Sequence, residues 1–203
     1  MNFFAFLLTI VGISLSGVMA PGPLTVATIT KGYNDRNAGI KIALGHGIVE
    51  IPIILLLYFG FAPFISSPEV KKIIGLIGGL MLVVMGLMMF RTMGKAIEER
   101  TDLPTRSIMT GIILTGANPY FLLWWATIGL ALITGATEFG IYGLIAFLVV
   151  HLSCDVLWEQ VISMTVFKTR HLWTAKTQKI VFAVCAVVLI GFGLYYGISV
   201  FSG

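Results

Sequence analysis

Residues 40–61 have the sequence IKIALGHGIVEIPIILLLYFGF, and this stretch decides the class of fold. Apart from Lys41, His46 and Glu50 it contains no Asp, Glu, Lys, Arg or His, and about 20 apolar residues suffice to cross a bilayer as a helix. Similar runs follow one another along the chain. The sequence therefore predicts an all-α integral membrane protein with six transmembrane helices, at residues 3–30, 40–65, 73–90, 108–134, 139–167 and 180–201.

The composition agrees with this class. Hydrophobic residues make up 58% of the 203 residues and charged residues 11%, whereas soluble domains keep about 25% charged. Six spans leave no room for a soluble catalytic domain, so we expect one transmembrane domain over residues 1–203 and no enzyme activity. No phosphate-binding glycine loop is present, which argues against an ATP-driven pump. We expect no cofactor and no nucleic-acid partner.

The basic residues predict the orientation, because cytoplasmic loops of membrane proteins are enriched in Lys and Arg. With both termini outside, the first, third and fifth loops become cytoplasmic and contain eleven of the 13 basic residues, leaving only Lys71 and Lys72 outside. The eleven are Lys31, Arg36, Lys41, Arg91, Lys95, Arg100, Arg106, Lys168, Arg170, Lys176 and Lys179. We therefore expect a multi-pass protein of the cytoplasmic (plasma) membrane with both termini outside.

The two halves of the chain resemble each other. His46 and Glu50 are matched by His151 and Asp155, each 105 residues later, and Pro21 is matched by Pro119 at 98. Each half holds three spans, an odd number, so the second half must enter the membrane upside down. The sequence therefore predicts two inverted three-helix repeats, at residues 1–95 and 105–203, an arrangement typical of transporters.

Helix-breaking residues lie inside the first and fourth spans. The first contains Pro21, Gly22 and Pro23, and the fourth contains Asn118 and Pro119. Proline removes a backbone donor and clashes with the preceding turn, so we expect both helices to be broken there. In lipid such breaks survive only where they face protein or a cavity. One break alone would favour a packing kink, but two at corresponding places favour a binding site.

Two histidine–acid pairs lie within the apolar runs. His46 and Glu50 are one turn apart on the second span, as are His151 and Asp155 on the fifth, and Glu159 continues the second face. Ionisable groups inside a membrane are costly and usually mark a pathway or a proton relay. The alternative is hydrogen bonding between helices alone. Pro52 follows Glu50 closely, and a distortion there would turn that carboxyl aside.

Two chemistries fit these four side chains. The carboxylates can bind an ammonium group or a proton while the histidines titrate near neutral pH. Alternatively, His46, Glu50, His151 and Asp155 can ligate a transition metal such as zinc or manganese. The sequence leaves both open.

These residues resemble the lysine exporter (LysE/RhtB) family of amino-acid exporters, in a prokaryotic, archaeal branch. The resemblance covers nearly the whole chain and includes Ala20-Pro21-Gly22-Pro23, Gly45-His46 with Glu50, Asn118-Pro119-Tyr120 followed by Leu122-Leu123-Trp124-Trp125, and His151 with Asp155. It implies about six spans and export driven by an ion gradient. Many relatives have Asn-Pro-Lys in place of Asn118-Pro119-Tyr120, so their substrates cannot be carried over.

The resulting hypothesis is a secondary exporter of amino acids or related small amino compounds that works by alternating access. The broken ends near Gly22 and Asn118 would bind a substrate carboxylate. Glu50 and Asp155 would hold the ammonium group or a counter-transported ion, the proton, with the histidines tuning them. A divalent-metal exporter and a non-transport membrane scaffold are the alternatives. Whether the protein forms a homodimer stays open.

Overall fold

The computed structural model describes residues 2–61, 68–92 and 106–202. All regular elements in these ranges are helical. In chain order they are α1 (Phe3–Val18), α2 (Pro23–Gly32), α3 (Ala38–Leu56), η1 (Leu57–Phe61), α5 (Pro68–Thr92), α7 (Ser107–Gly116), α8 (Pro119–Trp124), η2 (Trp125–Gly129), α9 (Leu130–Thr137), α10 (Gly140–Thr169), η3 (Arg170–Leu172) and α11 (Ala175–Ser202).

The first apolar run forms two helices instead of one. Helix α1 ends at Val18, helix α2 starts at Pro23, and their axes are bent by 77°. Proline fits this start because the first helical residue needs no amide donor. Gly22 precedes it in an extended conformation (φ −153°, ψ −169°). The chain therefore leaves helical geometry next to the Pro-Gly-Pro motif and resumes it at the second proline.

The fourth apolar run is also interrupted. Helix α7 ends at Gly116, and α8 begins at Pro119 with Asn118 as its N-cap. The wider π-helical turn η2 follows from Trp125, before the regular helix α9. Wide turns of this kind occur frequently at functional sites.

The described residues contain four helices long and apolar enough to cross a membrane, or five if α1 and α2 form one broken span. The four are Ala38–Gly60, Tyr120–Thr137, Gly140–Leu172 and Ala175–Tyr195. Within α5, the stretch Gly75–Arg91 is apolar but shorter. An all-helical protein with several spans is thus confirmed, whereas the count of six stays a prediction.

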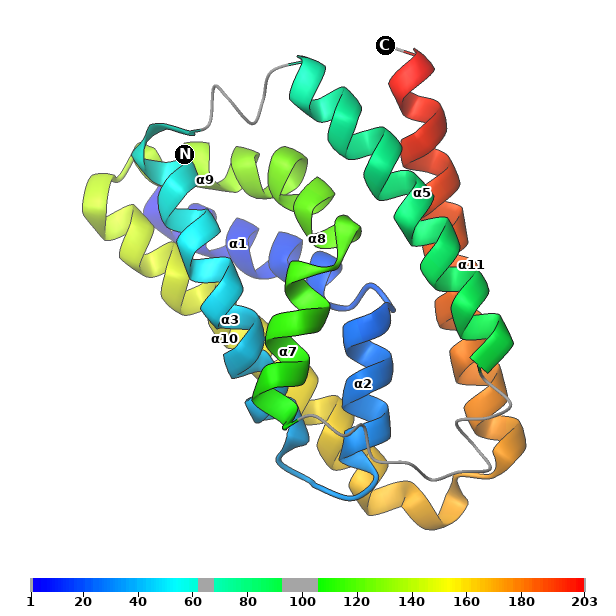
Figure 1. Cartoon of the computed structure of the whole chain (residues 1–203). Coiled ribbons are helices and arrows are strands. Elements are labelled where there is room, and N and C mark those ends of the chain that lie inside the picture. The colour runs from blue at the N-terminus through cyan, green and yellow to red at the C-terminus, as the bar shows by residue number, and fades with distance from the viewer. Residues whose placement is uncertain (1, 62–67, 93–105, 203) are drawn as a thin grey trace.

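Helices α1, α3, α7 and α10 pack around the centre of the bundle, with α3 on both α7 and α10 (Figure 1). Helices α5 and α11 form a long pair at one side. Glycines allow this pair to approach closely, because a Cβ added at Gly79 would lie 2.7 Å from the carbonyl oxygen of Gly193. Small residues at a helix contact commonly permit such close packing in membrane proteins.

The ends of the chain lie toward one side of the molecule, and the connections after α2 and after α10 lie at the other (Figure 1). In the first of these connections, Asp35 accepts a hydrogen bond at 2.6 Å from Lys41 of α3, and this contact lowers the pKa of the Asp35 carboxyl below its ordinary value. Lys95 and Arg100, assigned above to the third loop, lie outside the described residues. Which side faces the cytoplasm stays a prediction.

Candidate functional site

A cavity lies where the two helix interruptions meet α3 and α10. It holds about 830 Å³ of empty space, counting its open mouth. Eight of the nine residues singled out from the sequence line it, and the side chain of the ninth, Pro119, lies outside the described part of the chain. The eight are Pro21, Gly22, Pro23, His46, Glu50, Asn118, His151 and Asp155. Their role in binding stays a prediction.

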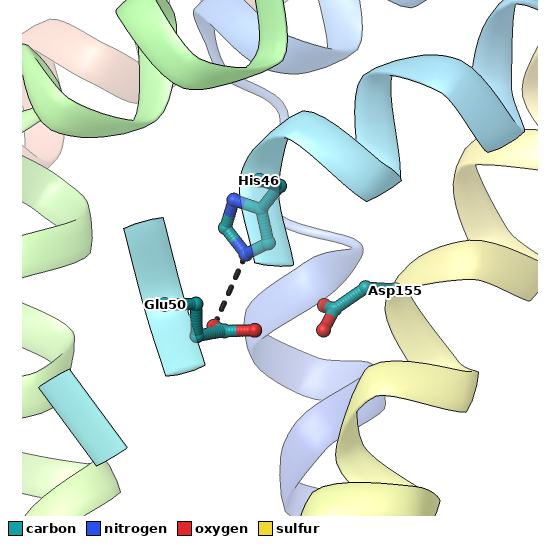
Figure 2. Close-up of side chains that lie close together, drawn as sticks. All are labelled: His46, Glu50 and Asp155. Atoms are coloured by element: carbon teal, nitrogen blue, oxygen red, sulfur yellow. Dashed lines mark hydrogen bonds and ion pairs between the residues drawn. The ribbon is translucent and has the colours of Figure 1, made fainter. Parts of the chain in front are cut away.

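The histidines and acids meet on one side of this cavity. His46 on α3 lies above the Glu50 carboxylate, which points toward Asp155 on α10 (Figure 2). The Nε2 atom of His46 is 3.1 Å from Glu50 Oε1, and the Nε2 atom of His151 is 3.2 Å from the same oxygen. Asp155 is farther away, with Oδ2 at 3.9 Å from His151 Nε2. One oxygen of Glu50 therefore lies within hydrogen-bond distance of both histidines.

Two hydroxyl groups fix the other sides of the imidazole rings. The Nδ1 atom of His46 is 2.8 Å from the Thr115 hydroxyl of α7, and that of His151 is 2.7 Å from the Ser14 hydroxyl of α1. Each ring is thus held at Nδ1 and directs Nε2 toward Glu50. Partners of this kind fix the orientation of a histidine that acts on a ligand or metal.

The carboxylates combine deep burial with unused acceptor atoms. Glu50 is 2% exposed and Asp155 5%. Glu50 Oε2 and Asp155 Oδ2 have no hydrogen-bond partner. Such groups are strongly destabilising in an apolar interior unless a proton or a cation accompanies them. Side-chain packing between helices does not account for these two free oxygens.

Pro52 does not turn Glu50 aside, contrary to the expectation above. Helix α3 continues through the proline to Leu56, and the wide turn η1 comes only afterwards. Glu50 lies two residues before the proline and keeps its place one turn after His46, with its carboxyl in the cluster. Proline removes one hydrogen bond on its N-terminal side, but α3 stays helical there and Glu50 keeps its contact with His46.

Aromatic rings enclose His151. Trp124 stacks on one side with ring centroids 5.5 Å apart, and Phe147 lies parallel at 5.3 Å. Trp125 meets the imidazole edge-on at 5.4 Å. Nothing in the sequence singled out Ser14 or Thr115 as partners of the histidines. The first span also contains Thr9, Ser16, Thr25 and Thr28, so no signal in the sequence distinguished Ser14.

Glu159 adds a third buried acid to the cavity. It lies one turn beyond Asp155 on α10, is 2% exposed, and has no partner for its Oε2 atom. The row of His151, Asp155 and Glu159 thus follows one face of α10 along the cavity, as their spacing of four residues predicts.

The helices α8 and α2 both start at the cavity, and they differ in which backbone amides already have a side-chain acceptor. Asn118 Oδ1 accepts a hydrogen bond from the Tyr120 amide at 3.1 Å, so the start of α8 is capped by its own chain. At the start of α2, the Gly22 amide donates to the Thr25 hydroxyl at 3.4 Å. Leu24 and Thr25, in the first turn of α2, line the cavity.

Comparison with known sequences identifies the family. The sequence model of the LysE type translocator family matches residues 15–199. The chain belongs to the LysE type translocator family. It is also 26% identical over 195 residues to a Bacillus subtilis (strain 168) protein named "Putative amino acid efflux protein YcgF", covering 93% of this chain and 92% of that protein. No solved structure matches the chain significantly.

The family assignment confirms the resemblance inferred from the sequence. LysE type proteins are translocators, so the chain is a transporter of the membrane and not an enzyme. Its apolar helices fit a multi-pass membrane protein.

Proposed function

We propose that this LysE family protein exports amino acids or related small amino compounds across the cytoplasmic membrane. The printed name of the Bacillus subtilis relative supports this class of substrate. The observation that carries the proposal is the pair of buried carboxylates, Glu50 and Asp155, each with an unpaired oxygen in one cavity.

The unpaired oxygens suit the ammonium group of an amino acid. An ammonium group offers three donors, and charge-assisted hydrogen bonds to carboxylates are among the stronger interactions in proteins. His46 and His151 lie within hydrogen-bond distance of Glu50, so they can exchange protons with the site as the substrate enters or leaves. We expect the coupling ion to be the proton.

Alternating access between two inverted repeats accounts for a second feature of the cluster. Ser14 of the first half holds His151 of the second, and Thr115 of the second half holds His46 of the first. Exchanging the halves turns one contact into the other, as a twofold relation between repeats requires. The packing of α3 on α7 and of α10 on α1 follows the same exchange. Both contacts support six spans with broken first and fourth helices.

The start of α2 would favour the carboxylate of the substrate, at the end opposite the ammonium group. The N-terminus of a helix carries partial positive charge and suits a carboxylate. Gly22 places this start at the same cavity as Glu50 and Asp155. The start of α8 contributes less, because Asn118 already satisfies one of its amides.

A divalent-metal exporter is the second candidate, favoured by one observation. Ligand atoms of His46, Glu50 and Asp155 lie within 4.8 Å of one another, a spacing that suits a metal ion. The cluster then binds the metal as cargo instead of an ammonium group. The four-residue set expected from the sequence includes His151, which also contacts Glu50.

Reconstituted vesicles separate the two candidates. Wild-type proteoliposomes loaded with a radiolabelled mixture of the twenty L-amino acids should lose specific amino acids when an inward proton gradient is imposed, and empty vesicles should not. Elemental analysis of the purified protein should find zinc and manganese far below one atom per chain. Stoichiometric metal together with unchanged amino-acid contents would refute the proposal in favour of the metal exporter.

A further inference from the structure

Glu159 is a buried acid that the proposed contacts of the substrate leave unused. It belongs to α10, lines the cavity, and has an Oε2 atom that is buried without a hydrogen-bond partner. The proposed function puts the ammonium group at Glu50 and Asp155 and the carboxylate at the start of α2. An ionised carboxylate with a free oxygen is strongly unfavourable in an apolar interior unless a proton or a cation accompanies it. Glu159 therefore needs a ligand of its own.

Glu159 lies where the cavity ends along α10. It is the last residue of this helix that lines the cavity, toward the side of the molecule where the connections after α2 and α10 lie (Figure 1). Beyond it, a Cβ added at Gly32 would lie 2.8 Å from the Cα atom of Ser163, so α2 packs directly on α10. The Ser163 hydroxyl and the Gln160 side-chain amide donate to the Arg36 carbonyl oxygen at 3.0 and 3.1 Å. These contacts hold the α2–α3 connection against α10 next to Glu159.

A hydroxyl group accompanies the Glu159 carboxyl. Thr28 of α2 is buried, and its side chain interacts with that carboxyl although its Oγ1 atom lacks a hydrogen bond of regular geometry. A hydroxyl donates to a carboxylate and accepts from a carboxylic acid, so Thr28 suits Glu159 in both states. Hard metal cations such as calcium take about six or more oxygen ligands, far more than this pair supplies. A proton needs no further ligands and no further space, so it fits this site best.

Charged side chains on three helices act on Glu159 or lie near it. Asp155 precedes it by one turn on α10, and α2, which packs on α10, carries the buried Lys31. His46 of α3 acts electrostatically on the Glu159 carboxyl, and its Nε2 atom is 3.1 Å from Glu50. Charges interact strongly in an interior of low dielectric constant. A change of charge at the substrate site is therefore transmitted to Glu159 through His46.

We propose that Glu159 binds the coupling proton of the transport cycle, at a site separate from the one that holds the substrate. This inference rests on the proposed export of amino acids and names the group through which a proton gradient drives it. The histidines exchange protons within the substrate site, whereas Glu159 holds the proton that crosses the membrane. The proton arrives from outside, forms the carboxylic acid while α10 is packed on the α2–α3 connection, and leaves when these elements separate and water stabilises the carboxylate. The O–H bond of this acid is the one bond that forms and breaks.

Two assays on the same proteoliposomes separate the proton from the substrate. Exchange of labelled for unlabelled amino acid needs no net proton movement, whereas efflux against a concentration gradient needs the inward proton gradient. The amino acid used is the one with the fastest exchange in a screen of the twenty L-amino acids. In Glu159→Gln the ratio of gradient-driven efflux to exchange should fall by about tenfold or more, because an amide does not bind a proton near neutral pH. Glu138→Gln is the matched control and should keep the wild-type ratio, since this acid is exposed and does not line the cavity.

The outcomes distinguish this inference from the proposed function. Absence of exchange with every amino acid in wild type would refute the proposed function, and this inference with it. Exchange in wild type together with an unchanged ratio in Glu159→Gln would refute the inference alone. Uphill efflux that follows an inward sodium gradient at equal pH, and not a proton gradient, would refute the proton as the ligand.

A chemical measurement on the wild-type protein decides the matter if Glu159→Gln also loses exchange or does not fold. Dicyclohexylcarbodiimide reacts with protonated carboxyl groups in apolar surroundings, and mass spectrometry locates the modified residue. With saturating amino acid, Glu50 and Asp155 should be protected while Glu159 is labelled, and its labelling should decrease as the pH rises. Glu159 that stays unlabelled at every pH at which the protein is folded, or that the amino acid protects as well as it protects Asp155, would overturn the separate proton site.

Discussion

Removal of the Asp155 charge tests the proposed export most directly. Asp155→Asn keeps the shape of the side chain and abolishes its negative charge. The Oδ2 atom has no hydrogen-bond partner, and its distance of 3.9 Å from His151 Nε2 exceeds that of a hydrogen bond. Little structure depends on this oxygen, so the free energy of unfolding should change by less than about 1 kcal/mol, within the range of hydrogen bonds between membrane helices.

The effect on transport should be much larger. If Asp155 holds the substrate ammonium group, the substitution removes a charge-assisted hydrogen bond worth about 1.5–3 kcal/mol. This corresponds to roughly a 10- to 150-fold loss of affinity. Efflux at substrate concentrations below KM should fall by the same factor. If the charge also takes part in proton coupling, transport driven by a proton gradient should be lost entirely.

The assay is amino-acid efflux from proteoliposomes at matched protein content, together with thermal unfolding in detergent. Asp35→Asn is the control, because this acid lies in the connection between α2 and α3, forms an exposed ion pair with Lys41 and accepts from the Asn37 amide through Oδ1. Exposed ion pairs contribute little, so its efflux should match wild type. Wild-type efflux by Asp155→Asn would show that the buried charge has no part in transport.

Three further perturbations follow from the packing and the charges. Gly17→Ala should lower transport several-fold and destabilise the protein by about 1–3 kcal/mol, because the new Cβ would lie 2.6 Å from Trp124 Nε1 in the cavity wall; efflux and unfolding measured together check this. Gly79→Ala should destabilise the α5–α11 pair by about 1–3 kcal/mol, whereas Gly191→Ala, with no atom within 4 Å, should have the unfolding midpoint of wild type. A cysteine placed at Asn34 should react with a membrane-impermeant maleimide only from the cytoplasmic side, and reaction from outside intact cells would reverse the orientation.

The sequence predicted those features of the fold that depend on local chemistry. Apolar runs require helices in lipid because each backbone polar group must be satisfied within its own segment. The helices are interrupted near Pro21 and Asn118, because proline and glycine disturb helical geometry within their own turn. The 77° bend could not be predicted, since it depends on how α1 and α2 pack against other helices.

In the candidate site, too, local contacts could be predicted from the sequence and contacts between distant helices could not. His46 and Glu50 could be paired from the sequence because helical periodicity brings residues four apart onto one face. The contact of His151 with Ser14 joins residues 137 apart and depends on the packing of α1 on α10. The stacking of Trp124 on His151 could not be predicted for a related reason, because it depends on how two separate helices pack.

The two carboxylates correspond to each other in the proposed repeat, yet their surroundings separate their tasks. Glu50 Oε1 lies within hydrogen-bond distance of both histidines, so loss of its charge weakens the contacts that position two rings. Asp155 makes no comparable contact, since its Oδ2 atom has no hydrogen-bond partner and lies 3.9 Å from His151 Nε2. In the proposed mechanism Glu50 therefore organises the histidines while Asp155 offers the charge that the substrate neutralises. Such a division of labour within a symmetric framework allows a single small molecule to bind in one defined orientation.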